Sequence, residues 1–69
     1  MVNTRKLKAV LVERGVTQAE AAKIVKLSPV AFFNKLHNKS EFNASEIMLL
    51  AEGLGIKNKD EIFFASNVE

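Results

Sequence analysis

Hydrophobic positions along the chain recur at intervals of three and four residues, the spacing that places side chains on one face of an amphipathic helix. Five segments show this pattern, beginning near residues 4, 17, 29, 44 and 58. Their expected inward positions are Leu7, Val10 and Leu11; Ala21, Ala22 and Val25; Phe32 and Leu36; Ile47, Leu50, Ala51 and Leu54; and Ile62 and Phe63. The pattern predicts an all-α bundle of five short helices with brief connections, with Phe42 returning to the core between the third and fourth.

Helix-start signals are densest in the second and third segments. Thr17 and Glu20 have the spacing of a capping box, in which each side chain bonds the other residue's backbone N–H. Ser28 is a second N-cap, and Pro29 follows at the first helical position, where its missing N–H costs nothing. The interval between the two helix starts, Thr17 and Ser28, leaves room for two turns and a bend before the next helix. We therefore predict a helix-turn-helix.

The other boundaries also carry recognisable residues. Gly15 and Gly55 are placed to end the first and fourth helices, since glycine readily adopts the left-handed conformation of a C-cap. Asn38 fits the same role after a third helix running to about residue 37. Asn43 and Glu46 have the spacing of a second capping box, and Asn58 opens the last short helix. Residues 65–69 are expected to fray.

Charge is unevenly distributed along the 69 residues, although the net charge is only +2. Residues 1–39 hold eight Lys or Arg and two acids, a balance of +6, whereas residues 40–69 have a balance of −4. A basic half that contains the helix-turn-helix fits a polyanionic partner. An ordinary solvated surface is the alternative interpretation of these charges.

Composition argues against several other classes of protein. The chain has no cysteine and a single histidine, His37, so a disulfide framework or a zinc site is not expected. It has no Gly-rich phosphate loop and no nucleophile–base pair, which predicts a non-catalytic protein without a cofactor or metal. No apolar run is long enough to cross a bilayer, and the basic residues do not form one amphipathic membrane-binding face. We expect a soluble intracellular protein.

The segments TQAEAAKIVKLSPVAFFNKL, NASEIMLLAEGLGI and DEIFF, in this order, resemble the Cro/repressor-type (XRE-like) helix-turn-helix domain of phage regulators. The resemblance covers about residues 4–64 and is greatest to the short variants of Gram-positive phages. It implies a lambda-repressor-like five-helix bundle in one domain, residues 1–69, with the third helix in the DNA major groove. It also implies a homodimer on two-fold symmetric operator DNA in the bacterial host cytoplasm. Lys26 and Asn38 depart from the family, which usually has glycine at both positions.

The resemblance and the helix pattern together select a DNA-binding site. Its expected residues are Gln18, Ser28, Pro29, Val30, Phe33, Asn34, Lys35, Asn38, Lys39 and Ser40. Asn34 is suited to bidentate pairing with adenine, and Val30 or Phe33 to thymine methyl groups. Four residues would meet the sugar–phosphate strand and contribute affinity without sequence information: Lys35, Asn38, Lys39 and Ser40.

The apolar face of the third helix supports a second hypothesis. Pro29, Val30 and Phe33 include no long hydrogen-bond donor, and exposed apolar residues are more typical of protein interfaces. The protein would then be an antirepressor or modulator of a lysis–lysogeny switch that binds the phage repressor. A core position for Phe33 is a further possibility, and Phe64 is the first candidate for a dimer contact.

Overall fold

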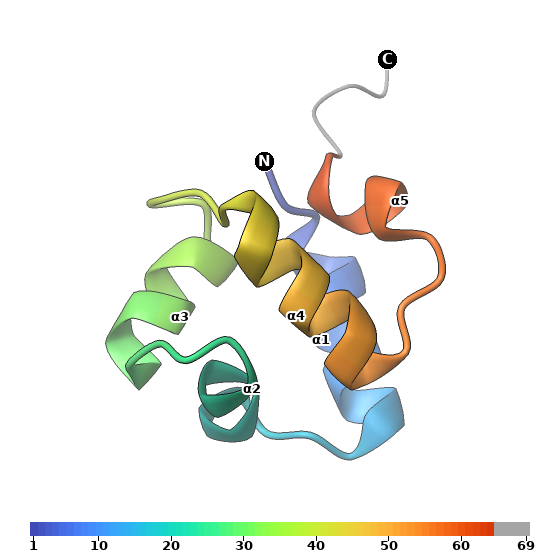
Figure 1. Ribbon diagram of the computed structural model, residues 1–69, viewed down its shortest axis with the longest axis horizontal. Coiled ribbons are helices and arrows are strands. Elements are labelled where there is room, and N and C mark those ends of the chain that lie inside the picture. Colours follow the sequence, from blue (N-terminus) through green and yellow to red (C-terminus); the bar gives the residue numbers. More distant parts are fainter. Residues whose placement is uncertain (65–69) are drawn as a thin grey trace.

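The computed structural model describes residues 1–64, and within them the chain is entirely helical apart from its connections (Figure 1). The helices are α1 (Thr4–Arg14), α2 (Gln18–Ile24), α3 (Pro29–Leu36), α4 (Ala44–Leu54) and α5 (Lys59–Phe63). The predicted all-α class is confirmed for this part of the chain, with each helix close to its expected place. The expected fraying of residues 65–69 lies outside the described residues.

Both predicted capping boxes are present. The backbone N–H of Glu20 donates to the Thr17 hydroxyl over 3.1 Å, and the Thr17 N–H donates to the Glu20 carboxylate over 2.9 Å. Asn43 and Glu46 make the same reciprocal pair at the start of α4, over 2.8 and 2.9 Å. These bonds satisfy N–H groups that a helix cannot pair internally, and so they fix where α2 and α4 begin.

Single caps begin α1 and α3. The Ser28 hydroxyl accepts from the backbone N–H of Ala31, and the Asn3 side chain accepts from that of Lys6, both over 3.1 Å. At α5, Asn58 precedes the helix as predicted, but its side chain makes no capping hydrogen bond. Because this helix has only five residues, packing of its apolar side chains has to account for its position.

Four of the described residues adopt positive φ, and all four follow a helix. Gly15 (φ 69°) and Gly55 (φ 67°) end α1 and α4 as predicted. Lys26 (φ 61°) and Asn38 (φ 65°) take the same conformation after α2 and α3. Asparagine tolerates it well, whereas lysine carries a steric cost of about 1 kcal/mol there.

The core joins all five helices. Leu7, Phe32, Leu36 and Leu50 are its largest fully buried side chains. The other buried apolar residues are Val2, Leu11, Ala21, Ala22, Val25, Ile47, Leu54, Ile62 and Phe63. Of the predicted inward positions, Val10 and Ala51 are only partly buried. Phe42 is also partly buried, and its ring lies edge-on to those of Phe32 and Phe63, with centroids 5.9 and 5.7 Å away.

The N-terminal segment, residues 2–4, joins the carboxyl end of α3 to α5. The Val2 side chain is buried, and the Asn3 backbone N–H donates to the carbonyl of Ile62. The Thr4 hydroxyl donates to the carbonyl of Leu36 over 2.6 Å. The periodicity of the five helices did not predict that Val2 belongs to the core.

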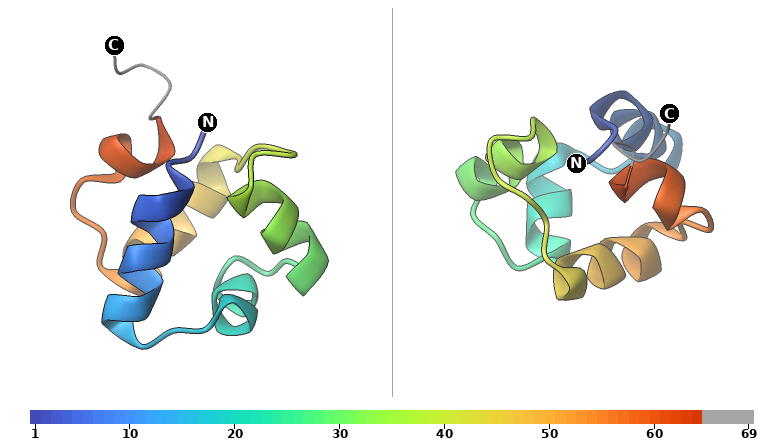
Figure 2. Two further views of the ribbon diagram at one scale, coloured as in Figure 1. Left: turned by 180° about the vertical axis from the view of Figure 1, so that it is seen from behind. Right: turned by 90° about the horizontal axis from the view of Figure 1, so that it is seen from above.

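The helices are arranged so that α3 lies at one side of the bundle and α5 at the other (Figures 1 and 2). One side of α2 packs on α3, and α4 contacts α1, α2 and α5. Consequently the inner face of α3 is covered, through Phe32 and Leu36, and its outer face is available to a partner.

Candidate nucleic-acid interface

The outer face of α3 is formed by apolar side chains and one amide. Val30 is 70% exposed and Phe33 is 46% exposed, so the possibility that Phe33 belongs to the core is wrong. Pro29 is also exposed at the amino end, and Asn34 is half-buried beside them. The structure therefore gathers Pro29, Val30, Phe33 and Asn34 on one helix, with the two largest apolar side chains in solvent.

The Phe33 ring contacts that of His37, one helical turn further along. The ring centroids of Phe33 and His37 are 4.3 Å apart, with the two planes inclined by 44°. His37 is half-buried and forms the C-cap position of α3. The His37 ring covers part of the Phe33 ring, and the rest of the Phe33 side chain remains in solvent.

Lys35, which we expected at a DNA phosphate, instead makes a largely buried ion pair between α3 and α4. Its Nζ donates to both carboxylate oxygens of Glu46, over 2.7 and 3.0 Å, and the two side chains are 18% and 11% exposed. Burial alone would raise the pKa of the Glu46 carboxyl. The hydrogen bonds from Lys35 and from the Asn43 backbone, together with the Lys35 charge, outweigh burial and lower that pKa below its ordinary value. The charge of Lys35 is thus neutralised within the protein.

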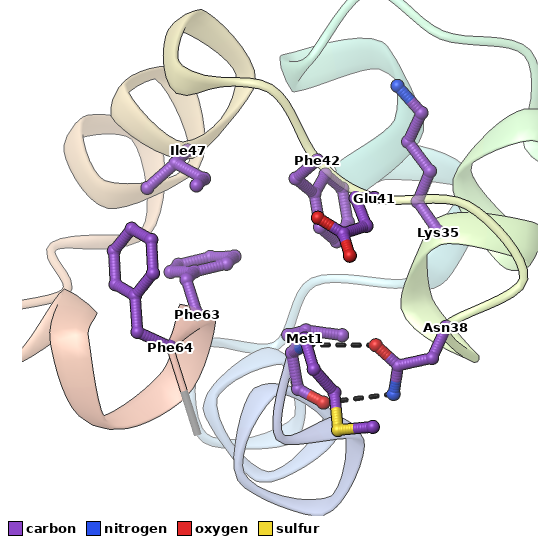
Figure 3. A pocket seen from close by; sticks show the side chains of 9 residues that line it. Met1, Lys35, Asn38, Glu41, Phe42, Ile47, Phe63 and Phe64 are labelled. Atoms are coloured by element: carbon purple, nitrogen blue, oxygen red, sulfur yellow. Dashed lines mark hydrogen bonds between the residues drawn. The ribbon is translucent and has the colours of Figure 1, made fainter. Parts of the chain in front are cut away.

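Asn38 likewise has an internal role. Its Nδ2 donates to the carbonyl of Val2 over 3.0 Å, and its Oδ1 accepts from the Val2 backbone N–H over 2.9 Å (Figure 3). The side-chain amide is therefore engaged on both its donor and its acceptor side. Asn38 and Lys35 hold the carboxyl end of α3 against the rest of the bundle, and the polar groups of both side chains are engaged within the protein.

The other expected polar contacts lie at the ends of α2 and α3. Lys39 and Ser40 are exposed just beyond α3, with their backbone N–H groups directed to the Asn34 carbonyl over 2.8 and 3.4 Å. Gln18 is exposed in the first turn of α2. The Ser28 hydroxyl is occupied as the α3 cap. Of these side chains, Gln18, Lys39 and Ser40 make no hydrogen bond within residues 1–64.

Two exposed lysines that sequence reasoning did not select lie near these residues. Lys8 of α1 lines the same shallow depression as Gln18 and Thr17. Lys26 lies in the turn that leads into α3. Neither carries a sequence motif. Lys8 becomes a candidate contact residue only in the folded protein, where it lies near Thr17 and Gln18 at the start of α2.

Phe64, the expected dimer contact, belongs to a different surface. It lines a cavity of about 80 Å³ between the N-terminal segment, α3 and α5, across from Lys35 and Asn38 (Figure 3). The remaining lining residues are Met1, Val2, Glu41, Phe42, Ile47 and Phe63. The structure does not bring Phe64 together with Val30 and Phe33. The two apolar surfaces selected from the sequence are separate.

No protein-family model matches this chain, and neither a curated protein nor a solved structure matches it. Within residues 1–64, no three His, Cys, Asp or Glu side chains are grouped so that they could hold a metal ion. No helix in that range combines the length and apolar character needed to cross a membrane.

Proposed function

We propose that this protein is a Cro-like phage transcriptional regulator that binds operator DNA, with α2 and α3 acting as a helix-turn-helix. The observation that carries the proposal is the outer face of α3. It is exposed over Val30 and Phe33 and is flanked in sequence by the exposed lysines Lys26 and Lys39. Neither lysine has an ion-pair partner among the described residues. A helix with a free face and cations at both ends has the form of an element that enters the major groove.

The residues divide into base-facing and backbone-facing groups. Val30, Phe33 and Asn34 would meet base edges, because they lie along the outer side of α3. Lys39 and Gln18, at the ends of the helix pair, would bind phosphate oxygens and fix the protein's register on the duplex. In this arrangement Lys35 and Asn38 position α3 and do not contact DNA.

The small size of the domain favours a dimer. A single module buries a limited area on DNA, and pairing two half-sites raises affinity through effective concentration. Phe64 and the cavity beside it are our candidate for the contact between two copies. The proposed site of action is the cytoplasm of a bacterial host, on a phage operator, without a catalytic role.

The test is a binding measurement by fluorescence anisotropy at two salt concentrations, using duplexes selected by the protein from a randomised pool. Selected duplexes should bind more tightly than scrambled ones, and binding should weaken steeply with salt. The K39A variant should weaken binding to all duplexes alike and lower the salt slope by about one. K57A, at an exposed lysine in the α4–α5 connection, is the matched control and should change neither. Equal affinity for selected and scrambled duplexes would refute specific operator binding.

The exposure of Val30 and Phe33 also favours a second candidate function. The same face of α3 would bind a phage repressor protein, making this chain an antirepressor or modulator of a genetic switch. The F33D variant should then abolish capture of the repressor in a pulldown, with little change in thermal melting. M48D, at a similarly exposed apolar residue of α4, should leave capture intact. Capture that survives F33D would rule this candidate out.

A further inference from the structure

The outer face of α3 offers few hydrogen-bonding groups to a partner, because polar side chains in and just after this helix bond within the protein. Lys35 is paired with Glu46, and the Asn38 amide is bonded to Val2. His37 is half-buried against the Phe33 ring. Among the side chains of α3 and its C-cap, Asn34 alone combines a place beside the exposed face with an amide that makes no hydrogen bond within residues 1–64. The rest of the exposed face is hydrocarbon.

We propose that α3 recognises DNA chiefly through the C5-methyl groups of thymine, so that its preferred half-site contains closely spaced thymines read by Val30 and Phe33. This inference rests on the proposed DNA-binding function and specifies its substrate. The thymine methyl is the one apolar group that a base pair presents in the major groove, and apolar side chains are its natural contacts. Asn34 adds a bidentate contact to an adenine nearby.

The spacing on the helix limits how far apart the contacted bases lie. Val30 and Phe33 are three residues apart and Val30 and Asn34 are four apart, so all three are neighbours on one helical face. Such neighbours have Cβ atoms about 5–6 Å apart. Successive base pairs are separated by about 3.4 Å along the duplex. The three side chains therefore cover two or three adjacent base pairs, on either strand.

The apolar side chains are also well ordered for this role. Val30 is β-branched and has one strongly preferred rotamer in a helix. The Phe33 ring packs against the His37 ring, with ring centroids 4.3 Å apart and the two planes inclined by 44°. The amino end of α3 is fixed by the Ser28 cap and by Pro29 at the first helical position. Little conformational entropy is lost when such side chains meet a methyl group, which makes a purely apolar contact effective.

The experiment replaces individual thymines by uracil in the duplex that the protein selects from a randomised pool. Uracil keeps every hydrogen-bonding group of thymine and lacks only the methyl. We expect affinity to fall about fourfold for each contacted methyl, the value for removing one buried methyl-sized group. Thymines outside the site should tolerate replacement. Uniform affinity for all uracil-substituted duplexes, with the selected sequence still preferred over a scrambled one, would overturn methyl recognition and leave the DNA-binding function standing.

Two variants assign the methyls to side chains. V30A and F33A should each make the protein indifferent to thymine or uracil at one position, so that the affinity ratio there falls to about one. Both residues are exposed, so these variants should fold, and circular dichroism checks this. K39A is the control and should weaken the thymine and uracil duplexes equally. Unchanged uracil effects in both V30A and F33A would overturn the assignment, and failure to select any duplex would overturn the proposed function itself.

Discussion

Replacing Glu46 by glutamine tests whether the ion pair between α3 and α4 stabilises the fold. The carboxylate accepts two hydrogen bonds from Lys35, over 2.7 and 3.0 Å, and one from the Asn43 backbone N–H, over 2.9 Å. In E46Q an amide oxygen at the Oε1 position can still accept from both the Asn43 N–H and Lys35, whereas the Lys35 bond to Oε2 is lost. The charge that compensates Lys35 is lost.

The expected cost follows from the burial of the pair. Hydrogen bonds to charged groups contribute about 1.5–3 kcal/mol, and removing one partner of a fully buried ion pair costs about 3–5 kcal/mol. The Lys35 side chain is 18% exposed, so its ammonium can regain some water in E46Q. We therefore expect a loss of about 2 kcal/mol in the free energy of unfolding. For a domain of this size, that lowers Tm by about 8–16 °C.

The assay is thermal and urea unfolding followed by circular dichroism, with E61Q as the matched control. Glu61 pairs with Lys6 over 3.6 Å, but these side chains are 61% and 50% exposed. Pairs of this kind contribute between about 0 and 1 kcal/mol, so E61Q should be nearly neutral. If E46Q loses no more stability than E61Q, the ion pair does not stabilise the protein and the reasoning is wrong.

The same carboxylate predicts how stability depends on pH. The pKa of Glu46 in the folded state lies below its ordinary value of 4.5. Its contribution is therefore complete above about pH 4.5, the unfolded value, and is lost as the pH falls through the lower folded value. In E46Q this part of the acid sensitivity should disappear, which urea unfolding at pH 7 and at pH 3 measures. An equal loss of stability in both proteins would contradict the assignment.

Substitutions at Lys26, Gly53 and Asn38 test the backbone and the helix contacts, each by thermal and urea unfolding. Lys26 has a φ of 61°. Glycine adopts this conformation without strain, so K26G should raise the unfolding free energy by about 0.5–1 kcal/mol, and a lower Tm would contradict this. A Cβ added at Gly53 would lie 2.8 Å from Ile24 Cγ2. G53A should therefore destabilise by about 1 kcal/mol, and the second substitution I24A should cancel the effect. N38G loses both side-chain bonds to Val2. It should cost about 1–2 kcal/mol, and N38A about 1 kcal/mol more because alanine resists positive φ. Equal stability of N38G and N38A would refute that account.

Much of the fold could be predicted because its helix boundaries are encoded locally. Thr17 and Asn43 each stand three residues before a glutamate, and both capping boxes form. Gly15 and Gly55 end their helices with positive φ, a conformation that glycine adopts without steric cost and that depends only on the local sequence. The sequence did not decide whether Phe33 is buried or exposed, because α3 has apolar residues on more than one of its faces.

The candidate site was harder to predict because its residues depend on contacts between distant segments. Glu46 was assigned a capping role from its spacing, and nothing in that spacing indicates a bond to Lys35, which depends on how α3 and α4 approach each other. Asn38 was expected to adopt positive φ, and it does, but its side chain bonds to Val2, 36 residues away. Lys35 and Asn38 were therefore expected at the DNA sugar–phosphate strand, because each was viewed without its partner in a distant segment.

The N-terminal segment has a consequence for the order in which the protein assembles. Asn3 is synthesised before any of the five helices, yet its backbone N–H finds its acceptor at Ile62, in the last of them. Closing so long a loop is slow relative to local helix formation. Residues 2–4 therefore complete their bonds only after α5 has been synthesised, and a nascent chain that stops before α5 leaves this segment half-anchored. The last helix, although only five residues long, finishes the attachment of the first.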